Sequence, residues 1–164
     1  MAPLLISDAN ILIDLEDGDL IAELFRLPYQ LQVPDMLFAD ELATDHGYLL
    51  ALGLQLGELT PASMADVELL VNKYKQPSRY DCFALVLAKQ QACPLLTGDQ
   101  NLRKAAEQEA IEVKGTLWLV AEMLRHSVIS VQVARNAYAC MQRKGRRLSW
   151  ALAESHLREI EASR

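Results

Sequence analysis

Four acidic residues fall in segments whose residue types suit metal chemistry. They are Asp8, Glu41, Asp81 and Asp99. Carboxylate oxygens are the ligands that Mg²⁺ and Mn²⁺ prefer, and Mg²⁺ usually binds one or two carboxylates together with waters and phosphates. Four carboxylates could therefore hold one ion with support from the remaining acids, or two ions. No set of cysteines and histidines in the sequence forms a competing zinc motif.

The elements that must position these acids follow from the apolar pattern. Short β-rich runs alternate with longer helical patterns, which predicts an α/β domain with a mostly parallel sheet. We expect strands at 4–7, 31–33, 54–59, 94–97 and 111–113. We expect helices at 11–15, 19–25, 99–109, 116–126, 131–143 and 148–161. Three more helices are expected to begin at Asp35 as the N-cap, at Thr60-Pro61, and at Ser78, and the last of these should run to about residue 92.

This arrangement brings the acids to one edge of the sheet. Asp8 and Asp99 follow predicted strands, and in open parallel sheets sites form outside the carboxyl ends of the strands. Asp81 begins a helix of about 12 residues, or roughly 18 Å. The following strand returns over roughly 16 Å, so Asp81 and Asp99 meet at the same edge. Glu41 lies early in the helix that leaves the strand at 31–33.

Each acid also has a purely structural interpretation. Asp81 fits a capping box with Ser78, Asp99 fits an N-cap, and Asp8 fits a turn with Asn10. Glu41 fits a solvated helix position. The metal-site interpretation is favoured because it explains why all four acids share one edge. Without metal, clustered carboxylates repel one another and retain some protons.

Composition narrows the class of protein. The chain has 164 residues, which suits one domain, and a net charge of −6, which argues against broad, non-specific binding to phosphate backbones. No apolar run is long enough to span a bilayer, and the first eight residues do not resemble a signal peptide. Cys82, Cys93 and Cys140 are expected to be reduced thiols. A cytoplasmic location is therefore expected.

The densest basic run is Arg143-Lys144-Gly145-Arg146-Arg147. Such a run is commonly a solvated loop, and the alternative is a contact with RNA or a partner. His46, His126 and His156 are scattered and have no visible partners for acid–base chemistry.

Several segments resemble PIN (PilT N-terminus) domains. Leu5–Ile13 is similar to their opening strand and turn, and Ser78–Ala88 to their third-acid helix. Leu95–Arg103 resembles their fourth-acid turn, and Ile111–Thr116 the strand and turn that follow. The resemblance spans about residues 4–125. It implies a three-layer α/β sandwich and a metal-dependent endoribonuclease, often the VapC-type toxin of a toxin–antitoxin pair.

The resemblance also implies roles for individual residues. It carries over Asp8, Glu41, Asp81 and Asp99 as the acidic quartet and requires Mg²⁺ or Mn²⁺. Asp40 and Asp45 compete for the second position, and Glu41 is preferred because this family usually has a glutamate followed by leucine. We expect Asp8 and Asp99 to bind metal directly, Asp81 to be shared or bridged by water, and Glu41 to position water.

The resemblance suggests substrate contacts as well. Asn10 and Thr97 match small polar positions beside the metal. Arg79, Arg103 and Lys104 either contact RNA phosphates or are solvated helix charges.

The last 38 or so residues depart from the compact toxins. We expect residues 1–126 to form the PIN-like nuclease domain and residues 127–164 to form a C-terminal helical extension packed on the same domain. Expected partners are an RNA substrate, an antitoxin protein and a second copy of the chain. The alternatives are a non-catalytic PIN-like interaction module and a structure-specific DNA nuclease. A phosphatase fits less well, because Asp8-Ala9-Asn10 lacks the second acid of a DxD motif.

Overall fold

The computed structural model describes residues 2–164 and contains one five-stranded sheet with the strand order β3-β2-β1-β4-β5. All four neighbouring pairs of strands are parallel, which confirms the predicted sheet. The strands are β1 (Leu4–Ser7), β2 (Gln30–Pro34), β3 (Gln55–Gly57), β4 (Leu95–Leu96) and β5 (Val113–Lys114).

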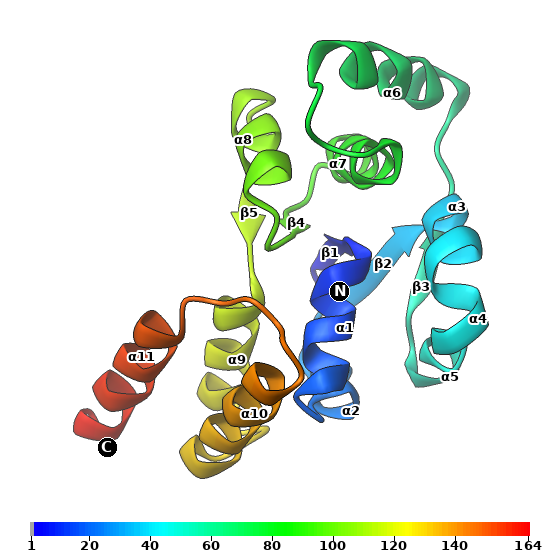
Figure 1. Ribbon diagram of the computed structural model, residues 1–164. Coiled ribbons are helices and arrows are strands. Elements are labelled where there is room, and N and C mark those ends of the chain that lie inside the picture. The colour runs from blue at the N-terminus through cyan, green and yellow to red at the C-terminus, as the bar shows by residue number, and fades with distance from the viewer. Residues whose placement is uncertain (1) are drawn as a thin grey trace.

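Helices connect the strands and extend the chain beyond β5 (Figure 1). The helices before β4 are α1 (Ala9–Asp17), α2 (Ile21–Leu24), α3 (Asp35–Leu37), the π-helical turn η1 (Phe38–Leu42), α4 (Ala43–His46), α5 (Leu49–Leu52), α6 (Pro61–Lys73) and α7 (Arg79–Gln91). Those after β4 are α8 (Gln100–Gln108), α9 (Thr116–Arg125), α10 (Val131–Arg143) and α11 (Trp150–Ala162).

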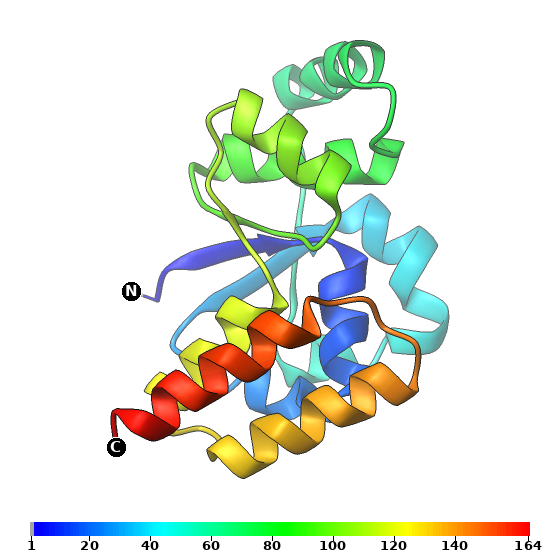
Figure 2. The ribbon, with the colours of Figure 1, turned by 60° about the vertical axis from the view of Figure 1, so that its left-hand side comes forward.

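Both faces of the sheet are covered by helices. Helices α7 and α8 lie on one side, with α6 outside α7, whereas α1, α9 and α10 lie on the other side (Figure 2). The predicted three-layer arrangement is therefore confirmed. Parallel sheets need this double cover because both faces of their strands are apolar.

Helix α7 lies at the centre of the core. It is buried continuously from Cys82 to Ala88, since it packs between the sheet and α6. A helix that is apolar around its circumference is typical of such an enclosed position. The predicted start at Ser78 is confirmed, because the Ser78 hydroxyl accepts a hydrogen bond from the Asp81 N–H at 3.1 Å. The packing of α7 thus fixes where its first turn lies.

Several boundaries differ from the predictions; strand β3, for example, covers Gln55–Gly57 where 54–59 was predicted. Two of the differences have a cause in the hydrogen bonds. Asp35 is the first residue of α3 rather than its N-cap, and among residues 2–164 its side chain accepts only from the adjacent Met36 N–H. Strand β5 begins at Val113, two residues later than predicted. The reason is that the Ile111 N–H still donates to the Ala106 carbonyl of the preceding helix, at 2.9 Å.

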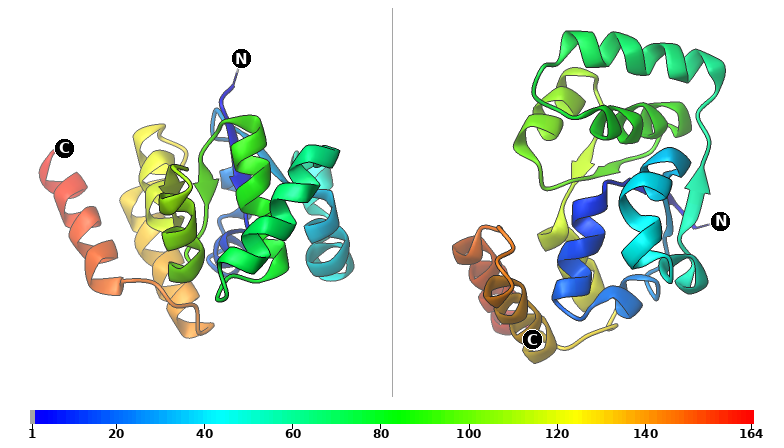
Figure 3. Two further views of the ribbon diagram at one scale, coloured as in Figure 1. Left: turned by 90° about the horizontal axis from the view of Figure 1, so that it is seen from above. Right: turned by 45° about the vertical axis from the view of Figure 1, so that its right-hand side comes forward.

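The C-terminal helices pack outward in sequence. Helix α10 lies against α1 and α9, and α11 lies against α10 at the outside of the molecule (Figure 3). The three cysteines are free thiols. Within residues 2–164, no helix has the length and apolar character needed to cross a membrane.

Candidate metal centre

The sheet topology creates a crevice between β1 and β4. From β1 the chain moves to β2 and β3 on one side, and it then returns to β4 and β5 on the other side. Ligands bind at such a switch point, outside the carboxyl ends of the strands. Ser7 pairs with Leu96, and the Asp8 N–H donates to the Leu96 carbonyl at 3.1 Å. Asp8 and the turn after β4 therefore lie side by side, as predicted.

Asp8 is a buried acid at the start of α1. Its Oδ1 accepts from the Ile11 N–H at 2.9 Å, and its Oδ2 accepts from the Thr97 hydroxyl at 2.5 Å. Burial raises the pKa of Asp8 to about 7, and the nearby charges of Asp81 and Asp14 add to the rise. This acid therefore has a fixed orientation, and its ionisation is unfavourable unless a cation compensates the charge.

Thr97 joins the two strand ends. Its buried hydroxyl donates to Asp8 and accepts from the Asp99 N–H at 3.1 Å. Asp99 in turn is the N-cap of α8, since its Oδ1 accepts from the Leu102 N–H at 2.9 Å. The predicted cap is confirmed. Its Oδ2 has no hydrogen bond within residues 2–164, so capping fixes this carboxylate without occupying both oxygens.

Asp81 combines a capping role with proximity to the other acids. Its Oδ2 accepts from the Ser78 N–H at 2.9 Å, which completes the predicted capping box. Burial raises the pKa of Asp81, and the charge of Asp99 raises it further. Oδ1 of Asp81 has no hydrogen bond in the described part of the chain. A capping role and a metal-binding role are therefore compatible at this residue.

Glu41 lies on η1, and its carboxyl group lies near Asp81. Partial burial is the largest cause of its raised pKa, and the charges of Asp81 and Asp40 add to it. Asp40, one rival for the second position, accepts a hydrogen bond from the Tyr80 hydroxyl. Asp45, the other rival, is exposed on α4 and makes no side-chain hydrogen bond or ion pair to any described residue. Of these three acids, Glu41 is therefore the best candidate for the second acid of the site, because the charge of Asp81 raises its pKa.

The four acids form an electrostatically connected set with Asp81 at its centre. The charge of Asp81 acts on Asp8 and on Glu41, and the charge of Asp99 acts on Asp81. Within residues 2–164, no three acidic, histidine or cysteine side chains are close enough to enclose an ion by themselves. An open set of oxygen donors suits Mg²⁺ or Mn²⁺, because Mg²⁺ keeps several waters and takes few protein ligands.

Asp14 is a further acid of this site that the sequence reasoning missed. It is buried on α1, where its Oδ2 accepts from the Thr116 hydroxyl at 2.9 Å and its Oδ1 accepts from Nε of Arg146 at 2.5 Å. A carboxylate between the apolar residues Leu12 and Leu15 was the signal in the sequence. Its partner Arg146 comes from the loop between α10 and α11, so the last part of the chain contributes directly to the site.

Of the residues predicted to contact substrate, Asn10 and Arg103 lie at the carboxyl edge of the sheet, whereas Arg79 is paired with an acid of α6. Asn10 is exposed beside Arg146, whose Nη2 donates to its backbone carbonyl at 3.3 Å. Nη2 of Arg103 lies beside Gly115 near the carboxyl edge, 3.8 Å from where a Cβ on that glycine would stand. Arg79 instead forms an ion pair with Glu68 of α6. Its guanidinium group therefore already has a carboxylate partner.

Comparisons with known proteins identify the family. The family model described as PIN domain (DUF3368) matches residues 4–162. Among solved structures, the chain is similar to a PilT N-terminus domain protein from the hyperthermophilic archaeon Sulfolobus solfataricus P2. The two share 16% sequence identity with a TM-score of 0.49, and the match covers 74% of this chain and 92% of that chain. A search of curated proteins gave no match. Because the family model spans nearly the whole chain, the chain belongs to the PIN domain family, which has a nuclease-type fold.

Proposed function

We propose that this chain is a divalent-metal-dependent endoribonuclease that uses Mg²⁺ or Mn²⁺ held by Asp8, Glu41, Asp81 and Asp99. The observation that supports this most strongly is the connected set of carboxylates at the switch point between β1 and β4. In this set the charge of Asp81 raises the pKa of Asp8 and of Glu41, and the charge of Asp99 raises the pKa of Asp81. Carboxylates that repel one another in a protein of a nuclease-type family are best explained by a cation that they share. The preference for RNA rests on the resemblance of the sequence motifs.

The roles of the residues follow from how firmly each is held. Asp8 and Asp99 are linked through Thr97 and fixed by helix caps, so they are suited to bind metal directly. Oδ1 of Asp81 has no hydrogen-bond partner among the described residues, so this acid can bind metal directly or through water. Glu41 is exposed and can orient the attacking water. The metal, when bound, lowers the pKa of a water and stabilises charge on the leaving oxygen.

The metal is tested by thermal unfolding with and without Mn²⁺. At about 100 times its dissociation constant, an ion that binds only the folded protein adds roughly 2.7 kcal/mol of stability. For a chain of this size, we expect a rise in Tm of roughly 5–11 °C. The rise should be lost or reduced in Asp81→Asn, in which the asparagine oxygen can still accept from the Ser78 N–H. Glu159→Gln, an exposed carboxylate on α11 without a polar contact to any described residue, is the matched control.

The substrate is tested by cleavage of labelled single-stranded RNA, single-stranded DNA and branched DNA of matched sequence. We expect wild-type protein with Mn²⁺ to cut RNA, and Asp81→Asn to cut it at least a hundredfold more slowly, by analogy with the loss of one charge-stabilising group elsewhere. Cleavage of DNA alone would replace the proposal with a DNA nuclease. Absence of both Mn²⁺ stabilisation and cleavage would indicate a non-catalytic PIN-like module.

We further propose a toxin role in the cytoplasm, with an antitoxin protein as partner. It rests on the resemblance to VapC-type toxins, and the helical extension is an added feature that those compact toxins lack. Induced expression of the wild-type chain in a bacterial host should stop growth, whereas Asp81→Asn should not. Normal growth with an active enzyme would refute the toxin role and leave the nuclease activity intact.

A further inference from the structure

Two hollows meet at the carboxyl edge of the sheet beside the acids. The first is lined by Asn10, Asp14, Asp99 and Arg146, among others. The second is lined by Thr97, Arg103, Gly115, Leu148 and Leu152, among others. Gly98 and Arg147 line both hollows. A Cβ on Gly98 would meet no atom within 4 Å, so the backbone is open to a ligand where the hollows join.

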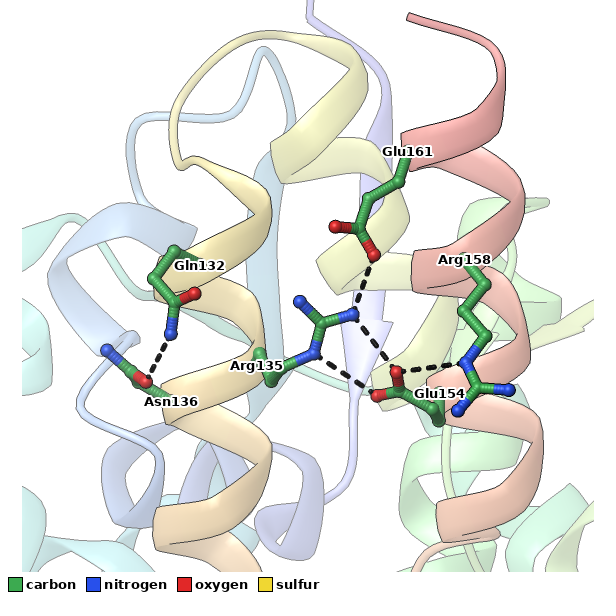
Figure 4. Close-up of polar contacts among 6 residues, drawn as sticks. All are labelled: Gln132, Arg135, Asn136, Glu154, Arg158 and Glu161. Carbon is green, nitrogen blue, oxygen red and sulfur yellow. Dashed lines mark hydrogen bonds and ion pairs between the residues drawn. The ribbon is translucent and has the colours of Figure 1, made fainter.

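The C-terminal extension supplies one wall through the loop between α10 and α11. Arg146 anchors this loop by its ion pair with buried Asp14. The helices that flank the loop are tied together by Arg135 of α10, which donates to Glu154 at 3.0 Å and to Glu161 at 2.7 Å (Figure 4). Arg147 therefore extends from a loop that is held both in its middle and by its two helices.

Arg103 and Arg147 are the cationic groups of the second hollow. Within residues 2–164, neither side chain has a hydrogen bond or an ion pair, although the protein has an excess of acids and a net charge of −6. The neighbouring Arg146 is fully engaged with Asp14. Two like charges on one hollow repel each other, so an anion between them would be stabilising. The guanidinium group binds phosphate oxygens through two parallel hydrogen bonds.

The surroundings indicate an anion that carries an organic group. Leu148 and Leu152 give the hollow an apolar side, against which a base or ribose can pack. Helices α9 and α11 both begin at this hollow, at Gly115 and Ser149, and neither N-cap side chain occupies the first N–H groups. These partial positive charges add to those of the arginines. A nucleotide unit fits these features better than free inorganic phosphate does.

We propose that Arg103 and Arg147 form a subsite for a backbone phosphate of the RNA strand, next to the phosphate that is cut at the acids. This inference rests on the proposed nuclease function and assigns a substrate-binding role to the C-terminal extension. The arginines position the strand and take no part in the chemical step. Their loss should therefore raise KM and leave kcat unchanged.

The test compares Arg103→Gln, Arg147→Gln and the double variant with wild type, using a fluorescein-labelled 12-nucleotide single-stranded RNA and Mn²⁺. Each phosphate contact with a single strand contributes about 0.7 to the steepness of the fall of log affinity with log salt concentration. One contact therefore makes binding about fivefold tighter at 0.1 M salt than at 1 M salt. We expect each single variant to raise KM by about fivefold and to lower this slope by about 0.7. The double variant should raise KM by about 25-fold, with kcat within twofold of wild type.

Arg26→Gln is the matched control. Arg26 is an exposed arginine in the turn before β2, at the opposite edge of the sheet, and it has no ion pair with a described residue. Its replacement removes the same charge and should change KM by less than twofold. Thermal midpoints of all variants should be close to that of wild type, since no hydrogen bond or ion pair within residues 2–164 is lost.

The outcomes separate the subsite from the nuclease function. If wild type cuts RNA but Arg103→Gln and Arg147→Gln behave like Arg26→Gln, the subsite is refuted and the nuclease function stands. A fall in kcat with unchanged KM also refutes it, because the arginines would then act on the chemical step. If wild type neither binds nor cuts RNA or DNA, the nuclease function fails and the subsite fails with it.

Discussion

Replacement of Asp8 by asparagine is expected to stabilise the metal-free protein at alkaline pH. The folded protein raises the pKa of this buried carboxyl group from 3.8 to about 7. Between these values the folded state binds more protons than the unfolded state, so stability falls as the pH rises from about 4 to about 7. The penalty is fully present above pH 7. A difference of 7 − 3.8, or about 3 pKa units at 1.36 kcal/mol each, corresponds to about 4 kcal/mol.

Asparagine removes this penalty and keeps most of the local contacts. Its oxygen can accept from the Ile11 N–H as Oδ1 of Asp8 does, and its amide can donate to the Thr97 hydroxyl. Thr97 must then change from donor to acceptor, at a cost of about 1 kcal/mol. The variant should be more stable than wild type by about 3 kcal/mol at pH 8, or roughly 6–12 °C in Tm. At pH 4 it should be slightly less stable.

The assay is urea unfolding in EDTA from pH 4 to pH 8.5, followed by the fluorescence of Trp118 and Trp150. Glu159→Gln serves as the control, because its side chain is exposed. A stability difference between Asp8→Asn and wild type that does not change with pH would refute the reasoning. Saturating Mn²⁺ should reverse the order at pH 8, because the wild-type carboxylate gains a ligand and the asparagine does not.

Three further substitutions test the supporting contacts. Thr97→Val leaves the Asp99 N–H and a buried oxygen of Asp8 without partners, and urea unfolding should show a loss of about 1–3 kcal/mol together with slower RNA cleavage. Arg146→Met leaves the buried Asp14 charge uncompensated and should lower the free energy of unfolding by about 3 kcal/mol. Adding Asp14→Asn should restore most of this loss, and a double variant no more stable than Arg146→Met alone would contradict the reasoning. Ser78→Ala removes the cap of α7 and should cost about 1 kcal/mol and weaken stabilisation by Mn²⁺, which thermal unfolding would measure.

The sequence predicted those parts of the site that depend on local geometry. Asp8 follows β1 directly and Asp99 follows the short turn after β4, so parallel pairing was enough to place them at one edge. The predicted length of the helix after Ser78 nearly equals the length of the strand that returns to Asp99, and this comparison placed Asp81 at the same edge. The structural interpretations of Asp81 and Asp99 as capping residues were also correct, because each cap uses one carboxylate oxygen and leaves the other without a hydrogen bond in residues 2–164. Asp8, which was interpreted as a turn residue, is instead the N-cap of α1.

The contribution of the C-terminal extension could not be predicted in this way. Asp14 and Arg146 are separated by 132 positions, and their ion pair depends on how α10 packs against α1. No periodicity or spacing encodes that contact. The family model spans both the predicted nuclease domain and the extension, and the division near residue 126 stays a prediction. Three residues of the basic run, Gly145, Arg146 and Arg147, line the first hollow, and the side chain of Arg146 is paired with Asp14.

The π-helical turn η1 has a consequence for alignments of this family. A π turn corresponds to one residue inserted into an α-helix, and each α-helical residue turns the chain by about 100°. A relative with a regular α-helix here would align with a one-residue gap between Phe38 and Leu42. The position of that gap decides whether Asp40 or Glu41 stands opposite the relative's second acid. Homologues should therefore be aligned at this helix by superposing their backbones, because an alignment of sequences alone can match the second acid to Asp40 in place of Glu41.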